Sequence, residues 1–435
     1  MNIENNLKLL EQNDPEIYNA IVGEENREKK GIELIPSENY TYPEVMAANG
    51  SVFTNKYSEG YPEKRYYGGQ EFTDTIENLA IERAKKLFKC DHANVQALSG
   101  SPMNQAVYLA FCQPGDTILG MDLSHGGHLT HGAPVSHMGK LFNFIRYKTI
   151  PEEKGRIDFK NLLKVAKKYR PKIVLCGYTS YPRDLNYTEF KKVADKIDAI
   201  TMADVSHIGG LIAAGVMRNP FDYGFDIVTT TTHKSLRGPR AGLILSRGKV
   251  SNPLKKPEMT RENIPTILDR SVFPGLQGGP HMHTIAAIAV TLKKAMEPEF
   301  VEYAKQVLKN AKSLAQVLMD NGAKLITNGT ENHMMVMDTI KSFNIKGAKA
   351  EKILEQVGIT VNKSVIPDDP EPPYSPSGIR LGTPAATTRG MKQNDMEKIG
   401  NWIIEALKNN QNESRLNKIH EKVENFCNKF QVPGI

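Results

Sequence analysis

Cysteines are scarce in this sequence and long apolar runs are missing, and each shortage excludes a class of protein. The 435 residues hold four cysteines without a CxxC pair, so neither a disulfide framework nor a structural zinc site is indicated. No apolar run approaches the roughly 20 residues that a membrane span needs. The N-terminal residues MNIENNLKLLEQNDPE lack the basic and then apolar pattern of a signal peptide. We therefore expect a cytoplasmic protein that does not enter a membrane.

Blocks of like charge are also missing. The 56 basic and 49 acidic residues are interleaved along the chain, so the net charge of +7 forms no concentrated basic surface in the sequence. Internal repeats and low-complexity tails are not found either. This composition argues against a nucleic-acid partner and leaves anionic small molecules as ligands.

Strand and helix patterns alternate through the middle of the chain. Apolar stretches at 172–177, 199–204 and 226–232 are typical of buried strands, and amphipathic stretches at 159–169 and 188–197 are typical of helices. Successive β-α-β units of this kind predict an α/β fold with a mostly parallel sheet.

A long helix leads from this region into a second unit. Apolar residues recur at helical spacing from Phe300 to Leu318, and a turn signal follows. Nearer the start of the chain, Asn5 to Asn26 is helix-like and polar, and 93–98 resembles a short strand. We predict an N-terminal arm at 1–45, a large domain at 46–299 and a smaller α+β domain at 300–435.

One lysine stands where a strand gives way to a loop. The run from Thr229 to Arg237, TTTTHKSLR, places Lys234 after four threonines. Ligands of α/β folds bind at strand ends, and an amine there can form a Schiff base with an aldehyde cofactor. For a lysine considered alone, a solvated loop position is the alternative.

Asp204 ends a predicted strand thirty positions before Lys234. A carboxylate there can keep the pyridine nitrogen of such a cofactor protonated, so that the ring accepts electrons from the α-carbon of a substrate. The alternative is a helix N-cap.

Two further motifs can bind anionic groups. Ser99-Gly100-Ser101 precedes a helix-like stretch, so it can hold a phosphate or act as a simple N-cap. Arg380, in SGIRLG, can bind a carboxylate through two hydrogen bonds or remain a surface cation.

Three histidines, His125, His128 and His131, are spaced by threes, which is compatible with a metal site on one helical face. No cysteine or carboxylate cluster lies nearby in the sequence to complete a coordination shell. We therefore expect no metal.

Five motifs together resemble serine hydroxymethyltransferase, and they occur in the order found in that family: KYSEGYPEKRYYGG, SHGGHLTHG, TTTTHKSLRGPRAG, FPGLQGGPHMH and SGIRLGTPAATTRG. The resemblance runs from Leu34 to about Gly390. It implies a pyridoxal-phosphate enzyme of the aspartate aminotransferase fold type, whose large domain has a seven-stranded, mostly parallel sheet flanked by helices. It also implies an obligate homodimer with shared active sites, and it leaves open whether dimers pair into tetramers.

The implied reaction is the reversible transfer of the serine hydroxymethyl carbon to tetrahydrofolate, which gives glycine and 5,10-methylenetetrahydrofolate. It implies an aldimine on Lys234 and a glycine quinonoid, and it belongs to one-carbon metabolism and amino-acid biosynthesis. The sequence does not decide between retro-aldol cleavage and direct displacement.

The resemblance also implies residue roles. Catalysis would depend on Lys234, Glu59, Tyr67, His233 and Thr231. The cofactor would be held by Lys234, Ser99, Gly100, Ser101, His128, Ser180, Asp204, His207, Gly278, Gly279 and Tyr57. The amino acid would be bound by Ser37, Glu59, Tyr67, His207 and Arg380. The folate would be bound by Leu123, Gly127, His128, Leu129, Pro372, Pro373 and Tyr374, and Arg240 would give local support. His128 would stack on the cofactor ring, and Gly278 and Gly279 would approach from the partner subunit.

Some positions depart from the family pattern. Pro36 replaces the usual Ala, Ser364 replaces the usual Asn, and the segment 372–374 replaces a typical Ser-Pro-Phe. The last two lie near the folate tail in the family, so a modified pterin stays open as the carrier. A folate-independent aldolase of the same fold, such as threonine aldolase, and a non-catalytic nucleic-acid-binding protein are the rival interpretations.

Overall fold

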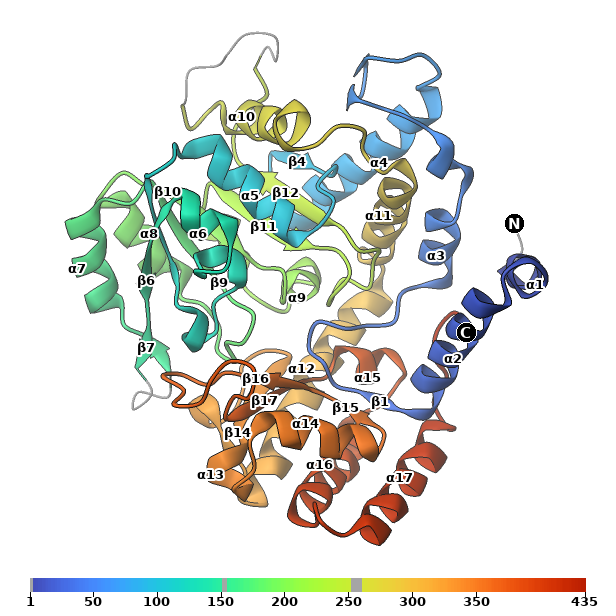
Figure 1. Ribbon diagram of the computed structural model, residues 1–435. Helices are drawn as coiled ribbons and strands as arrows, with labels where there is room; N and C mark the ends of the chain where they lie inside the picture. The colour runs from blue at the N-terminus through green and yellow to red at the C-terminus, as the bar shows by residue number, and fades with distance from the viewer. Residues whose placement is uncertain (1–2, 151–154, 252–259) are drawn as a thin grey trace.

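A seven-stranded sheet forms the centre of the computed structural model, which describes residues 3–150, 155–251 and 260–435. The strand order is β4 (His92–Asn94), β12 (Gly242–Ser246), β11 (Ile227–Thr231), β10 (Ile200–Asp204), β9 (Ile173–Gly177), β5 (Thr117–Met121) and β6 (Asn143–Tyr147). Strand β12 is antiparallel to both neighbours, and the pairs from β11 to β6 are parallel (Figure 1). The predicted fold class is therefore confirmed.

Helices cover both faces of this sheet. Because alternate strand residues point to opposite faces, Ile173 and Leu175 pack in one core cluster while Val174 and Cys176 pack in another. The first cluster includes side chains of α5 (Gly100–Phe111), α6 (His137–Leu141) and α10 (Ile264–Arg270). The second includes side chains of α4 (Glu71–Phe88), α7 (Phe159–Tyr169), α8 (Tyr187–Asp195) and α11 (Met282–Lys294). Burial of both strand faces explains the continuous apolar runs in the sequence.

The C-terminal residues form a second unit, below the central sheet in Figure 1. Its antiparallel sheet has the order β13 (Lys324–Leu325), β14 (Met334–Asp338), β17 (Gly378–Gly382) and β16 (Asn362–Ser364). Its other core elements are α14 (Gly347–Gln356), β15 (Ile359–Thr360), α16 (Gln393–Lys408) and α17 (Glu413–Cys427).

Helix α12 (Pro298–Asp320) joins the two units. Phe300 and Val307 pack in the core of the large sheet, whereas Leu314 and Leu318 pack in the C-terminal core. One helix is thus shared by two cores.

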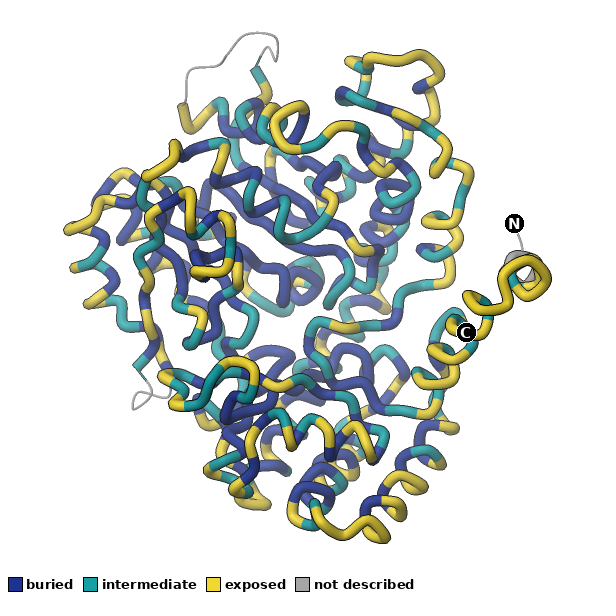
Figure 2. Tube along the Cα trace, viewed as in Figure 1, coloured by how far each residue is buried: buried dark blue, intermediate teal, exposed yellow. Residues whose placement is uncertain are grey.

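The N-terminal segment packs against the C-terminal unit. Helices α1 (Ile3–Asn13) and α2 (Pro15–Lys30) lead to β1 (Ile32–Glu33), which pairs with β15, and Ile32 and Leu34 are buried in the C-terminal core. Figure 2 shows that residues 7–13 of α1 and much of α2 are largely exposed while the central strands are buried. The predicted domain boundaries at 45 and 299 stay a prediction, and the arm's first two residues lie outside the described chain.

Two local predictions differ from the structure. The helix-like stretch from Asn5 to Asn26 is two helices, because Asp14 accepts a hydrogen bond from the Ile17 amide and Pro15 begins a new helix. The strand predicted at 93–98 stops at Asn94. The Asn94 side chain accepts a hydrogen bond from the Gln96 amide, so this amide is not available for strand pairing.

The remaining elements are short. They are the helices α3 (Pro43–Asn49), α9 (Gly209–Ala213), α13 (Thr339–Phe343) and α15 (Pro384–Thr388), the strands β2 (Gly60–Tyr61), β3 (Lys64–Arg65), β7 (Thr149–Ile150) and β8 (Arg156–Ile157), and the helical turns Val52–Asn55, Leu123–His125, Leu129–His131, Pro220–Tyr223, Ser271–Leu276 and Ile326–Asn328. Across the described ranges, none of the helices combines the length and the apolar character needed to cross a bilayer.

Candidate functional site

The loops after β5, β9, β10 and β11 meet at the carboxyl edge of the parallel strands, where α/β folds bind ligands. A cavity of about 560 Å³ opens there. Predicted site residues that line it are Ser37, Leu123, Gly127, His128, Leu129, Ser180, His207, His233, Lys234, Arg240 and Arg380. Lining residues that the site prediction left out are Glu38, Thr179, Asn362, Lys363, Ser364 and Val365.

Lys234 lies three residues beyond β11 and is half-buried in the cavity wall. Its backbone carbonyl accepts hydrogen bonds from the Asn39 side chain and the Arg237 amide, at 3.1 and 3.0 Å, which fixes the loop. Burial lowers the pKa of Lys234 to about 8. A lysine with this pKa is partly neutral near physiological pH, as a nucleophilic amine must be.

Asp204 ends β10 and is 5% exposed. One carboxylate oxygen accepts hydrogen bonds from Asn104 Nδ2 at 2.8 Å and His131 Nε2 at 3.0 Å. The other accepts from the Ser206 amide and hydroxyl. Burial alone opposes ionisation, but the bonds from His131 and Ser206 outweigh it and hold the pKa of Asp204 well below its usual range. The site therefore contains a buried, ionised carboxylate.

His128 presents a neutral ring to the cavity. Its Nδ1 accepts a hydrogen bond from the Thr130 amide at 3.2 Å and lies 2.7 Å from the Thr130 hydroxyl. Burial lowers the pKa of His128 to about 4. An uncharged imidazole of this kind can lie flat against another ring.

The three evenly spaced histidines do not converge. His125 turns away, with Nδ1 2.8 Å from the Thr149 hydroxyl and Nε2 3.2 Å from Asp368. Among the described residues, the group with metal-ligand spacing is His128, His131 and Asp204, whose ligand atoms lie within 4.8 Å of one another. His131 Nε2 and Asp204 Oδ2 already bind each other, and His128 Nδ1 already contacts the Thr130 hydroxyl.

The predicted phosphate cradle lies beside the end of β11. Helix α5 begins at Gly100, and the Ser99 hydroxyl makes no cap bond to the helix. A Cβ on Gly100 would lie 2.9 Å from Thr231 Cγ2, so the close approach of these segments requires glycine. Ser99, Gly100, Ser101, Thr231 and Asp204 do not line the cavity that holds Lys234.

Arg380 enters the cavity from β17 of the C-terminal unit. Its Nε donates to Asn362 Oδ1 at 3.2 Å, and its Nη1 donates to the Thr179 carbonyl. Burial lowers the pKa of Arg380 to about 10, which leaves the guanidinium charged at neutral pH.

His207 stacks on His333, with ring centroids 5.5 Å apart and a 3.3 Å contact between Nδ1 and Nε2. Burial keeps the pKa of His207 well below its usual range and lowers that of His333 to about 3. No local pattern in the sequence indicates His333, Asn104 or the role of His131, because their partners lie far away along the chain.

Five predicted residues form a separate group. The Tyr67 hydroxyl donates to Glu59 Oε2 at 3.0 Å, a Cβ on Gly278 would lie 3.2 Å from Glu59 Oε1, and a Cβ on Gly279 would lie 3.0 Å from the Tyr57 ring. Glu59 and Gly278 line another cavity, of about 440 Å³, and none of the five lines the Lys234 cavity. We call these five residues the Glu59 cluster.

Pro372, Pro373 and Tyr374 lie in the loop between β16 and β17, and none of them lines either cavity. Tyr374 is 78% exposed. Their predicted contact with folate stays a prediction.

The residues at the strand ends fit pyridoxal phosphate. They combine an amine of lowered pKa, a buried carboxylate for a ring nitrogen, a neutral imidazole and a helix N-terminus for a phosphate. The fold and this donor set define a pyridoxal-phosphate-dependent enzyme.

Comparison with known proteins identifies the family. The serine hydroxymethyltransferase family model matches residues 10–403. Proteins named serine hydroxymethyltransferase from Xanthomonas campestris pv. campestris strains B100, 8004 and ATCC 33913 are each 48% identical over 425 residues, which covers 98% of this chain and 98% of theirs. The chain belongs to the serine hydroxymethyltransferase family, as its five motifs indicate, and it is a one-carbon transferase of serine and glycine metabolism.

Proposed function

We propose that the enzyme carries the serine hydroxymethyl carbon reversibly to tetrahydrofolate, and that Lys234 holds pyridoxal phosphate covalently. The observation that carries this proposal is the placement of Asp204 at the end of β10 and of Lys234 just beyond the neighbouring parallel strand β11, with Asp204 paired in register to Thr229. An amine and an ionised carboxylate so placed suit the two ends of a pyridoxal ring.

The bound cofactor supplies an electron sink for the substrate's α-carbon. Asp204 would keep its ring nitrogen protonated, and the segment from Ser99 to Ser101 would hold its phosphate. His128 would cover one face of the ring and exclude water from it. Ser180 would contact the cofactor oxygen, and His207 would lie against the ring or its oxygen.

Arg380 would bind the carboxylate of serine or glycine. A rigid, charged guanidinium fixes the orientation of the amino acid and so selects which α-carbon bond lies perpendicular to the ring. Ser37 would contact the substrate hydroxyl, His233 and Thr231 would act beside Lys234, and Arg240 would support the site. Leu123, Gly127 and Leu129 would border the pterin.

Glu59 would move protons at the substrate hydroxyl and the folate, with Tyr57 and Tyr67 beside it. The Glu59 cluster lines no part of the Lys234 cavity of its own chain, and Tyr57 and Tyr67 are 60% and 48% exposed. These facts support a homodimer in which each chain lends its Glu59 cluster to the other. A cytoplasmic location is also part of the proposal.

Turnover with and without the carrier tests the function. Glycine formation from serine should accelerate strongly when tetrahydrofolate is added, and equal rates would favour a folate-independent aldolase. The visible absorption of the bound cofactor should change when glycine and reduced folate are added together. Lys234→Ala should lower turnover by at least about a thousandfold while the circular dichroism spectrum is kept, since the lost group is chemical.

A further inference from the structure

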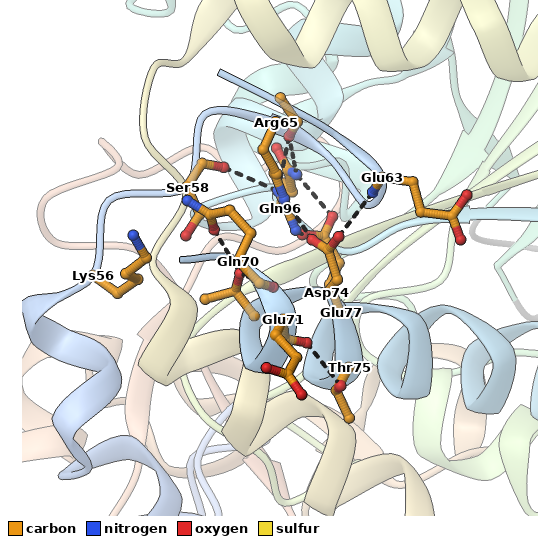
Figure 3. A network of polar contacts seen from close by, with 12 residues as sticks. Lys56, Ser58, Glu63, Arg65, Gln70, Glu71, Asp74, Thr75, Glu77 and Gln96 are labelled. Carbon is orange, nitrogen blue, oxygen red and sulfur yellow. Dashed lines mark hydrogen bonds and ion pairs between the residues drawn. The ribbon is translucent and has the colours of Figure 1, made fainter. Parts of the chain in front are cut away.

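A buried ion pair supports the loop that carries Glu59 (Figure 3). Arg65, on β3, donates through Nη2 to Glu77 Oε2 at 2.5 Å and through Nε to Asp74 Oδ1 at 2.9 Å. The side chains of Arg65 and Glu77 are 3% and 1% exposed. A buried pair costs desolvation and is a poor source of stability by itself, so its presence calls for another explanation.

The remaining hydrogens of Arg65 reach the backbone on both sides of Glu59. Its Nη1 donates to the carbonyl of Ser58 at 2.9 Å and to the carbonyl of Gly60 at 3.0 Å. The Tyr66 amide donates to the carbonyl of Glu59 itself at 3.2 Å. One guanidinium therefore fixes the peptide groups that set the direction of the Glu59 side chain.

Gln96 completes this support. Its Nε2 donates to the Gly60 carbonyl at 2.9 Å and to Glu77 Oε1 at 2.7 Å, so it binds both the loop and the partner of Arg65. The backbone carbonyl of Gln96 accepts a hydrogen bond from Gln277 Nε2 at 2.8 Å. Because Gln277 immediately precedes Gly278 and Gly279, the same network holds the other half of the Glu59 cluster.

We propose that Arg65 is a positioning residue of the reaction: held by Glu77 and Asp74, it aims the Glu59 carboxylate. This inference rests on the proposed function of Glu59. Arg65 lines neither of the two cavities and acts only through the backbone that it holds.

The test is a double-variant cycle on the holoenzyme. Arg65→Lys keeps the positive charge but cannot donate to two carboxylates and two carbonyls at once. We expect kcat for tetrahydrofolate-dependent glycine formation to fall by about 100-fold, since misplacing a reacting group by about 1 Å costs that much. The KM for serine should change less than about threefold. Adding Arg65→Lys to Glu59→Gln should lower kcat no further.

Two readouts do not depend on turnover. Hydrogen exchange at the Tyr66 amide should speed up in Arg65→Lys, because its acceptor on Glu59 is released. Arg261→Lys is the matched control, since Arg261 also binds two carboxylates, Asp226 and Asp198, and a backbone carbonyl. It should leave kcat and Tyr66 exchange unchanged.

Additive losses in the double variant would overturn the inference and leave the role of Glu59 standing. Wild-type turnover by Glu59→Gln would overturn the proposed role of Glu59 and the inference with it. If Arg65→Lys does not fold, Gln96→Met replaces it, because it removes the bonds to Gly60 and Glu77 while the ion pair stays. Gln96→Met should likewise lower kcat when Glu59 is present and should not lower it further in Glu59→Gln.

Discussion

The side-chain amide of Asn104 lies 2.8 Å from the Asp204 carboxylate, and its second hydrogen reaches the Thr130 hydroxyl at 3.0 Å. Thr130 in turn holds His128, and the Thr229 hydroxyl donates to the Asn104 carbonyl at 2.9 Å. One buried asparagine thus links the carboxylate proposed for the ring nitrogen to the imidazole proposed for the ring face.

Asn104→Leu should therefore lower kcat by about tenfold and stability by about 1–3 kcal/mol, because it leaves buried polar partners unsatisfied. Steady-state kinetics and thermal unfolding measure the two effects. Asn310→Leu is the control, since buried Asn310 likewise donates to a threonine hydroxyl and a carbonyl, those of Thr387 and Met391, outside the site. A loss of kcat as large in the control would contradict the assignment.

The lowered pKa of Lys234 predicts how the apoenzyme captures pyridoxal phosphate. Only the neutral amine attacks an aldehyde, so the capture rate should rise with pH and level off above about 8. An unperturbed lysine, with a pKa of 10.5, would keep gaining rate well beyond that point. Stopped-flow absorbance across a pH series distinguishes the two profiles.

Gly100→Ala should weaken cofactor binding by about tenfold, because the new methyl group would overlap Thr231 Cγ2 and displace the phosphate cradle. Thr231→Ser removes that methyl group and keeps the hydroxyl, so the double variant should regain affinity. Equilibrium dialysis with pyridoxal phosphate gives the dissociation constants. Gly23→Ala is the matched control, since a Cβ there meets no atom within 4 Å. Failure of Thr231→Ser to restore binding would show that the overlap is not the cause.

Mixing two variants that are each strongly impaired tests the shared site. In a dimer that exchanges Glu59 clusters, a hybrid of Lys234→Ala and Glu59→Gln chains has one intact site. Random re-pairing should then restore about a quarter of wild-type activity. If both residues serve the same chain, every site keeps one defect and the mixture stays as impaired as the separate variants.

The predicted parts of the fold are those with local signals. Strands β9, β10 and β11 were predicted because burial on both faces makes their sequences continuously apolar. Strand β6, at the edge of the sheet, was not, because NFIRY is partly exposed and mixes polar with apolar residues. Strand β17, with two glycines and Arg380, also lacks a strand pattern, and its place comes from pairing with β14.

The residues of the site also divide into those with a local signal in the sequence and those without one. Lys234 and Asp204 stand at strand ends, where α/β folds bind ligands, so the sequence alone indicates that they belong to a site. Asn104 and Gln96 have no such signal, since each gains its role from partners that the fold brings together, such as Asp204, 100 residues away. Glu77 appears in the sequence as an ordinary helix residue, although it is almost fully buried.

The 23 residues of α12 contribute to both hydrophobic interiors, so neither half of the protein can loosen alone without exposing apolar surface on its neighbour. Lys234 belongs to one half and Arg380 to the other. Heating should consequently separate the amine from the guanidinium in a single cooperative melting event, with no preceding stage in which one half stays ordered.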